Sequence, residues 1–217
     1  PALIASGSNT ILLKSTIQFN KPLVFKGLYN STDTLFISGN NTSNIFWINL
    51  GHNLVSEQIV LDSIVIVNAL SSNSFAAIDY TGGVGDSLII SNSVFQRNYG
   101  TNGLNVLQME GKINLNIHSS IFSNNHINQA GSVIHLNSTG GDSKVEINNS
   151  SMVNNTAPYG NQALFFNSLM PFTNTIPSKF PTFFVHSVSI TNSTFTGHTT
   201  NYLEYGIRIK AGLTGTK

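Results

Sequence analysis

The chain has 217 residues, of which 9% are charged, and its formal net charge at neutral pH is +1. This balance, without a basic run, argues against a nucleic-acid groove or an anionic membrane surface as the partner, and the longest apolar stretches fall far short of the roughly 20 residues that a membrane span requires. The chain has no cysteine, which excludes disulfides and thiolate chemistry, while an apolar fraction of 40% supplies enough side chains for a core.

Short apolar segments, separated by polar residues and glycines, occupy residues 1–58. Their length and their content of Val, Ile, Phe and Thr predict β-strands of irregular spacing. We therefore expect strands, and not helices, from the start of the chain. The segments are Thr10–Leu13, Ile17–Phe19, Leu23–Phe25, Thr34–Ile37 and Ile45–Leu50.

An internal repeat follows, over residues 59–212. Four segments of it align without gaps, and a weaker fifth copy precedes them. The starts of the five copies lie 29, 27, 30 and 43 residues apart, and an insertion near residues 168–181 accounts for the last, longer interval. The copies are Leu61–Ala69, Ile90–Asn98, Ile117–Asn125, Ile147–Asn155 and Ile190–His198.

Apolar and polar residues alternate with a period of two around the start of each copy. This alternation predicts a half-buried strand, and the Asn-Ser or Ser-Ser pair that follows predicts a turn. A large apolar residue lies five positions after each start, and in the four aligned copies Asn or His lies three positions beyond it. A second strand is predicted next, at Phe75–Ile78, Leu104–Leu107, Ser132–Leu136, Ala163–Phe166 and Tyr205–Ile209.

Units this short cannot each bury an apolar face, so stacking must give them a shared core. Equivalent residues then lie about 4.8 Å apart and form ladders along the stack. We expect a single all-β domain over residues 1–217, a right-handed parallel β-helix of about seven rungs, irregular at 1–58 and regular at 59–212. A β-sandwich is the alternative. The predicted ladder residues are Phe95, Asn98, Phe122, Asn125, Met152, Asn155, Phe195 and His198.

A Phe-x-x-Asn motif after an Asn-Ser or Ser-Ser turn is intact at Phe95–Asn98 and Phe122–Asn125, and it is altered at Met152–Asn155 and Phe195–His198. It resembles the repeat of chlamydial polymorphic outer membrane proteins, which pair this motif with Gly-Gly-Ala-Ile. The resemblance covers about residues 60–210 and implies a β-helix of the pectin lyase-like class, used as a passenger or surface domain in adhesion or display. The second motif survives only as Ala130–Val133, Asn161–Leu164 and Tyr205–Ile207.

The Asn-x-Ser/Thr pattern that accepts N-linked glycans recurs along the chain, which is rich in all three residue types. Composition alone and a secreted glycoprotein both account for this density. We expect Asn149 and Asn192 to be unmodified, because their turn position suits an internal asparagine ladder. The predicted glycan-bearing residues, which fall in or near loops or point outward from a strand, are Asn30, Asn40, Asn137, Asn148 and Asn154.

Acidic residues are few and scattered along the repeat. Asp86 and Asp142 occupy similar glycine turns but lie two rungs apart, too far to share a metal ion. No pair of histidines has the spacing of metal ligands. We therefore expect no catalytic residue, no metal site and no cofactor. A carbohydrate-active β-helix enzyme, either a polysaccharide lyase or a glycoside hydrolase, is the alternative, and it would need clustered carboxylates.

The sequence thus predicts a non-catalytic structural or adhesive segment of a larger surface, matrix or filament protein, secreted or at the cell surface. We expect the chain to be a piece of a longer or processed protein. Open rungs at both ends predict self-association, end to end or lateral, and surface glycans or proteins are the other expected partners. A carbohydrate-binding adhesin is a further alternative, indicated by Tyr99, Tyr159 and Tyr202, which follow successive turns.

Overall fold

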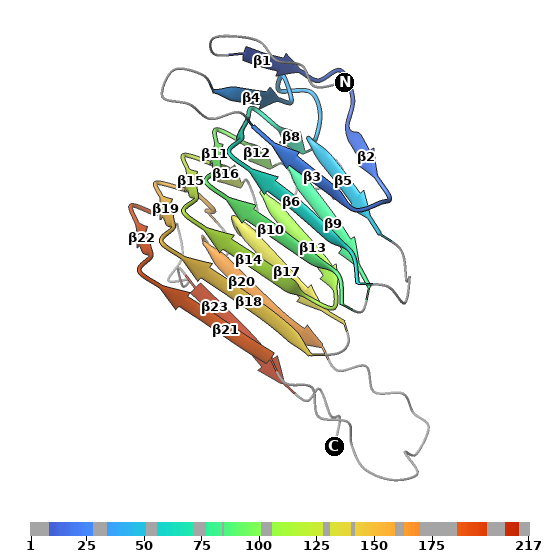
Figure 1. Ribbon diagram of the computed structural model, residues 1–217. Helices are drawn as coiled ribbons and strands as arrows, with labels where there is room; N and C mark the ends of the chain where they lie inside the picture. The colour runs from blue at the N-terminus through green and yellow to red at the C-terminus, as the bar shows by residue number, and fades with distance from the viewer. Residues whose placement is uncertain are drawn as a thin grey trace.

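The chain forms an all-β parallel solenoid, whose strands stack from the blue N-terminal end to the red C-terminal end of Figure 1. Neighbouring strands pair in parallel, so the expected parallel β-helix is confirmed as a fold class and the sandwich alternative is not formed. Among the residues described, no helix is long and apolar enough to cross a bilayer. The computed structural model describes residues 9–27, 34–50, 56–71, 77–83, 85–100, 106–127, 131–139, 142–158, 163–169, 186–198 and 207–212.

Four sheets run along the solenoid, and the chain visits sheets 1 to 4 in that order within each complete turn. Sheets 1 and 2 are joined by a tight turn of the backbone. Sheet 1 contains β3 (Leu23–Lys26), β6 (Gln58–Asp62), β10 (Ser87–Ser91), β14 (Asn114–His118), β18 (Ser143–Asn148) and β21 (His186–Thr191). Sheet 2 contains β1 (Asn9–Leu12), β4 (Leu35–Ser38), β7 (Val65–Val67), β11 (Val94–Gln96), β15 (Ile121–Ser123), β19 (Ser151–Val153) and β22 (Thr194–Thr196).

Sheets 3 and 4 complete the turn, and sheet 3 is the shortest of the four. Sheet 3 contains β8 (Leu70–Ser71), β12 (Tyr99–Gly100) and β16 (His126–Ile127). Sheet 4 contains β2 (Ile17–Phe19), β5 (Phe46–Asn49), β9 (Ile78–Gly82), β13 (Leu107–Gly111), β17 (Ile134–Ser138), β20 (Leu164–Leu169) and β23 (Ile207–Gly212).

The solenoid makes about 4 turns, which corrects the expectation of about seven rungs. A complete turn visits all four sheets, and sheet 3 has three strands, extended by an isolated bridge between His126 and Thr156. The sequence-based expectation of about seven rungs counted every repeat and every N-terminal group of strands as a full rung. In the described residues, however, the outer levels carry no strand on sheet 3, so they are partial turns.

The second strand of each repeat begins later than the sequence predicted. β13 begins at Leu107 and not at Leu104, and β17 begins at Ile134 and not at Ser132. The chain bends at the start of these strands, because the N–H groups of Val106 and Leu107 both donate to Val133 O, at 3.0 and 2.9 Å. Apolar residues on both sides of this bend are buried, so they gave the appearance of one continuous strand.

Inward-facing side chains form columns along the core. Leu88, Leu115 and Val145 lie in register on neighbouring strands of sheet 1, and all three are at most 1% exposed. On sheet 2, the rings of Phe95 and Phe122 stack with centroids 4.4 Å apart and planes within 5°. Met152 and Phe195 follow in register in the same column. Each buried side chain of this size stabilises the fold by about 1.5–3 kcal/mol.

Two tight turns in each repeat hold one residue in the left-handed backbone region. Asparagine is favoured there because its short polar side chain tolerates positive φ better than most residues do. The first turn, between sheets 1 and 2, has φ of 48–57° at Ser63, Asn92, Ser119, Asn149 and Asn192. The second turn, between sheets 2 and 3, has φ of 52–67° at Asn68, Arg97, Asn124, Asn154 and Gly197.

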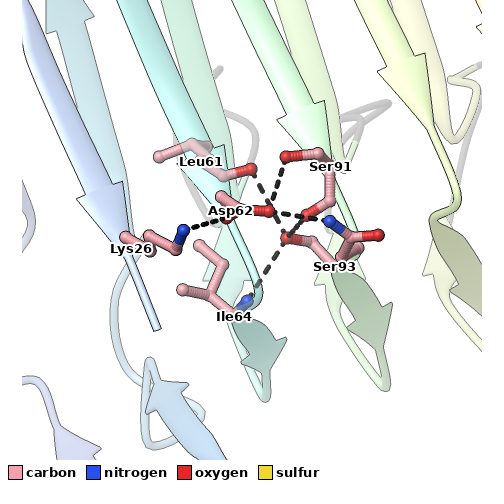
Figure 2. A network of polar contacts seen from close by, with 7 residues as sticks. Lys26, Leu61, Asp62, Ile64, Ser91 and Ser93 are labelled. Carbon is pink, nitrogen blue, oxygen red and sulfur yellow. Dashed lines mark hydrogen bonds and ion pairs between the residues drawn. The ribbon is translucent and has the colours of Figure 1, made fainter. Parts of the chain in front are cut away.

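A serine ladder fills the inner side of the first turn. Ser120 Oγ accepts the N–H of Ser93 at 3.2 Å, and Ser150 Oγ accepts the N–H of Ser120 at 3.1 Å. Ser93 Oγ accepts in the same way from the preceding turn and donates to a carbonyl of its own turn (Figure 2). The expectation that Asn149 and Asn192 point inward is wrong: both are exposed, and the inward position belongs to the serine after them.

An asparagine ladder fills the inner side of the second turn. Asn125 Oδ1 accepts the N–H and the Nδ2 group of Asn98, at 3.1 and 3.0 Å. Asn155 Oδ1 accepts the corresponding groups of Asn125, at 3.0 and 2.9 Å. Each amide also donates to a backbone carbonyl, as Asn125 Nδ2 does to Phe95 O at 3.0 Å. The three asparagines are at most 3% exposed, so all of these bonds are buried.

Different residues occupy the two ends of the asparagine ladder. Ala69 takes the position before Asn98, and its N–H donates to Asn98 Oδ1 at 3.0 Å. His198 takes the position after Asn155, with its Nδ1 atom 3.3 Å from Asn155 O. Burial lowers the pKa of His198, against the opposing effect of its backbone hydrogen bonds. The ladder thus passes from an apolar residue through three asparagines to an imidazole.

Replacing Asn125 by Ala tests the asparagine ladder. The change leaves the N–H and Nδ2 groups of Asn98 without their acceptor in a buried site, so Asn125→Ala is expected to lower the free energy of unfolding by about 3 kcal/mol. Urea titration followed by circular dichroism measures the loss. The matched control is Asn124→Gly in the neighbouring exposed position, where glycine readily adopts the φ of 54°. Its free energy of unfolding is expected to stay within about 0.5 kcal/mol of the wild-type value. Equal losses in both variants would contradict a stabilising ladder.

Candidate functional site

A polar network surrounds Asp62 at the end of sheet 1 (Figure 2). Ser91 Oγ and Asn92 Nδ2 donate to Asp62 Oδ1 at 2.7 and 2.9 Å, and Lys26 Nζ lies 3.5 Å from Oδ2. Partial burial raises the pKa of Asp62, but the hydrogen bonds from Ser91 and Asn92 and the charge of Lys26 outweigh it, so the pKa is lowered overall. Asp62 is therefore an ionised carboxylate that joins three successive turns.

A shallow hollow of about 290 Å³ lies further along the outer face of sheet 1. Its carboxylate, Glu146, accepts from Asn116 Nδ2 at 3.5 Å and lies 2.8 Å from Lys144 Nζ. His118 and Asn148 complete its polar wall. The acid in this hollow has a lysine partner, as Asp62 has, so each of these two carboxylates is balanced by a cation.

Two carboxylates lie on neighbouring strands on the outer face of sheet 4, diagonally across from each other. Asp79 on β9 lies opposite Gln108 on β13, and Glu110 follows two residues further along β13. Gln108 Nε2 donates to Glu110 Oε1 at 3.3 Å. The sequence-based expectation of scattered acids did not bring the two together. They are about one repeat apart in the chain, and the predicted strands Phe75–Ile78 and Leu104–Leu107 ended before either of them; extending both strands by a few residues is the step that would have placed the pair on one face.

Burial, and then the negative charge of Glu110, raise the pKa of Asp79 to about 6. The side chain of Asp79 is only 7% exposed although it faces away from the core. Trp47 and His135 lie in register on the same outward column, and burial lowers the pKa of His135. Glycoside hydrolysis uses a carboxylic acid of raised pKa together with a second carboxylate, so Asp79 and Glu110 are the candidates that the described residues offer for such a pair.

A second hollow, of about 470 Å³, follows the second turn and sheet 3. In it Tyr99 on β12 stacks on His126 of β16, with ring centroids 4.9 Å apart and planes within 15°. His126 Nδ1 lies 2.6 Å from the Thr156 hydroxyl, and Tyr99 is 37% exposed. The other two tyrosines of the sequence prediction, Tyr159 and Tyr202, lie outside the described residues.

The predicted glycan-bearing asparagines occupy different environments. Asn40 and Asn154 are exposed in turns with φ of 54° and 53°, and Asn148 is exposed at the end of β18. Asn137 lies on β17 and not in a loop, and it is half-buried. Asn30 lies outside the described residues.

Metal binding has no evident site in the described part of the chain. No group of three or more His, Asp or Glu side chains there could hold an ion. Asp86 is 1% exposed, and it accepts the N–H groups of Gly83 and Glu57 at 2.6 and 2.9 Å. This carboxylate closes its glycine turn onto the preceding turn of the solenoid.

No protein-family model, curated protein or solved structure matches the chain. The parallel solenoid is evident from the strand pairing, whereas the resemblance to the polymorphic outer membrane protein repeat has no family match behind it. The chain's own geometry is therefore the basis for assigning its function.

The pH dependence of stability tests the environment of Asp79. Its pKa rises from 3.8 to about 6 on folding, so the folded chain binds the proton more tightly. The contribution of this protonated side chain to the free energy of unfolding is complete below pH 3.8, and it is lost as the pH rises through about 6. Asp79→Asn keeps the shape and removes the charge, so it is expected to raise the melting temperature by about 3 °C at neutral pH and to leave it unchanged in acid.

Thermal melts of the wild type and of Asp79→Asn across this pH range measure the effect. Glu110→Gln serves as the control. It removes only the neighbouring charge, so it is expected to raise the melting temperature at neutral pH by less than Asp79→Asn does. Identical melting curves for the wild type and Asp79→Asn at every pH would show that Asp79 is solvated like an ordinary surface carboxylate.

Proposed function

We propose that the chain is a non-catalytic structural or adhesive segment of a larger surface, matrix or filament protein, secreted or at the cell surface. The observation that carries the proposal is the exposure of core-facing residues on the outermost described strands of the stack. Ile209 on β23 is 52% exposed, although its register partner Phe166 on β20 is 1% exposed. At the other end Phe19 on β2 is half-buried, whereas its partner Ile48 is fully buried.

These ends favour the addition of another β-rung. In the described residues no further strand pairs with β23 or with β2, so each presents an unpaired backbone edge beside apolar side chains. Such an edge is a template for strand pairing, and burial of the apolar residues makes the pairing of a further strand more favourable in free energy. A head-to-tail contact between copies repeats without closing, and it therefore leads from dimers to filaments.

Two finer features belong to the same proposal. The solenoid is right-handed, because crossovers between parallel strands of one sheet are right-handed in nearly all proteins. Its repeat is of the polymorphic outer membrane protein type, within the pectin lyase-like class. The Phe-x-x-Asn spacing supports this, since Phe95 and Phe122 stack in the core and Asn98 and Asn125 form the ladder three residues later.

The non-catalytic assignment is supported by the lysine partners of Asp62 and Glu146 on sheet 1. Asp79 and Glu110 on sheet 4 favour the competing assignment, a carbohydrate-active enzyme. Hydrolysis or β-elimination on a panel of polysaccharides, lost in both Asp79→Asn and Glu110→Gln, would establish that enzyme in place of the structural role.

Self-association of the 217-residue chain tests the structural role. Sedimentation velocity over a range of concentrations is expected to show oligomers that grow with concentration, because both ends expose apolar side chains. Ile209→Lys places a charge on the open end and is expected to shift the midpoint of association at least about 10-fold higher in concentration.

Ile121→Lys is the matched control for that variant. Ile121 is 43% exposed on the outward side of β15, in the middle of the stack. End-to-end assembly predicts that Ile121→Lys associates like the wild type. A selective loss of association in Ile121→Lys would indicate lateral packing of the solenoids, and a monomeric wild type at high concentration would contradict both modes.

Glycan occupancy tests the secreted setting. When the chain is expressed in a eukaryotic secretory pathway, peptide mass spectrometry is expected to find glycans at Asn40, Asn148 and Asn154, because these sequons are exposed. The half-buried Asn137 is expected to be modified to a lesser extent. Unmodified asparagine at Asn40, Asn148 and Asn154 together would remove the support for a secreted glycoprotein.

A further inference from the structure

We propose that the hollow beside Tyr99 is a binding site for an oligosaccharide that carries carboxylate or sulfate groups. The inference rests on the adhesive part of the proposed function and gives it a ligand class and a site. It follows from three features of the hollow: an exposed aromatic column, a row of amide side chains, and one cation without an acidic neighbour among the described lining residues.

The aromatic column is held in place by the neighbouring turns. Tyr99 stacks on His126 with planes within 15°, and the Thr156 hydroxyl bonds the imidazole at 2.6 Å. Leu70 precedes Tyr99 in the same register column of sheet 3. Leu70 and His126 flank Tyr99 along the stack, so the three side chains form one column whose exposed part is held at little cost in conformational entropy. The C–H face of a sugar ring lying along the solenoid packs on the exposed edge of this column while its hydroxyls reach the polar rim.

The polar rim is the outward position of the second turn. Val67, Gln96 and Ser123 lie in register, so Asn68, Arg97 and Asn124, which follow them, stack at one position per turn. All three have left-handed backbone and line the hollow beside Tyr99. Neighbouring turns are about 4.8 Å apart, comparable to the length of one sugar ring. An extended oligosaccharide lying along the solenoid axis therefore meets a new polar side chain at each ring.

Arg97 decides the charge of the ligand. It occupies a position that carries asparagine in the turns on either side, and φ there is 54°. Its guanidinium makes no hydrogen bond or ion pair within the described part of the chain, and the described residues that line the hollow include no Asp or Glu. Guanidinium groups bind carboxylate and sulfate oxygens in a bidentate way. The hollow is thus complementary to an anionic sugar and has a neutral rim for its hydroxyls.

Isothermal titration calorimetry on the 217-residue chain tests the inference with three probes: a galacturonic acid tetrasaccharide, a heparin-derived tetrasaccharide and a neutral galactose tetrasaccharide. We expect at least one of the two anionic probes to bind more tightly than the neutral one. Carboxylate and sulfate are distinguished by which of the two gives the higher affinity.

Arg97→Asn is the central variant, because it installs the residue of the adjoining turns and suits the left-handed backbone. It is expected to weaken binding of the preferred anionic probe about 10- to 100-fold and to leave the neutral probe unchanged. Tyr99→Ala is expected to weaken all three probes. Lys144→Asn removes the same charge from sheet 1 and is expected to bind like the wild type.

Three results would overturn the site. These are the absence of binding by all probes at millimolar concentration, equal affinities in Arg97→Asn and the wild type, and an equal loss in Arg97→Asn and Lys144→Asn, which would show a general charge effect. Thermal melts of each variant establish that it is folded. The titrations are repeated with Ile209→Lys, so that a failure of sugar binding is distinguished from a failure of self-association.

Discussion

Each tight turn of this solenoid places a backbone N–H in the interior where no strand can pair with it, and the acceptor is a side chain of the next turn. Ser120 and Ser150 serve the first turn in this way, and Asn125 and Asn155 serve the second. A buried N–H without a partner costs about 1–3 kcal/mol, so the stacking of turns depends on these side chains as much as on the apolar core. The bonds are made between turns, so a single repeat on its own would lack the acceptors that its buried N–H groups need.

The same geometry explains the scarcity of charge. Stacking in register places equivalent side chains one above another, and a column of like charges would repel along the whole axis. Asn and Ser donate and accept at once, so a column of either type satisfies itself without a counter-ion. Where a carboxylate does occur in such a column, as Asp62 does, serine, asparagine and lysine from the neighbouring turns surround it.

The order of strands and their parallel stacking could be predicted from the sequence, because the repeat places alternating apolar residues before each turn. The number of complete turns could not, since it depends on the two-residue strands of sheet 3, such as Tyr99–Gly100, which have no alternation to detect. The hollow beside Tyr99 and the pairing of Asp79 with Glu110 both depend on register between turns. The predicted second strands ended at Ile78 and Leu107, before Asp79 and Glu110, so the carboxylate pair was missed although the offset between the two strands was correct.

In the second turn, the residue that holds the fold together and the residue that faces solvent are different, neighbouring residues. The inner asparagine of each turn is fixed by its bonds to the turns above and below, whereas the residue before it, such as Asn68, Arg97 or Asn124, is limited chiefly by its left-handed backbone, a cost of about 1–2 kcal/mol for a bulky side chain. Surface chemistry at this edge can therefore change over evolutionary time, one turn after another, while the interior remains the same. A lineage could retune what the edge recognises without redesigning the scaffold that presents it.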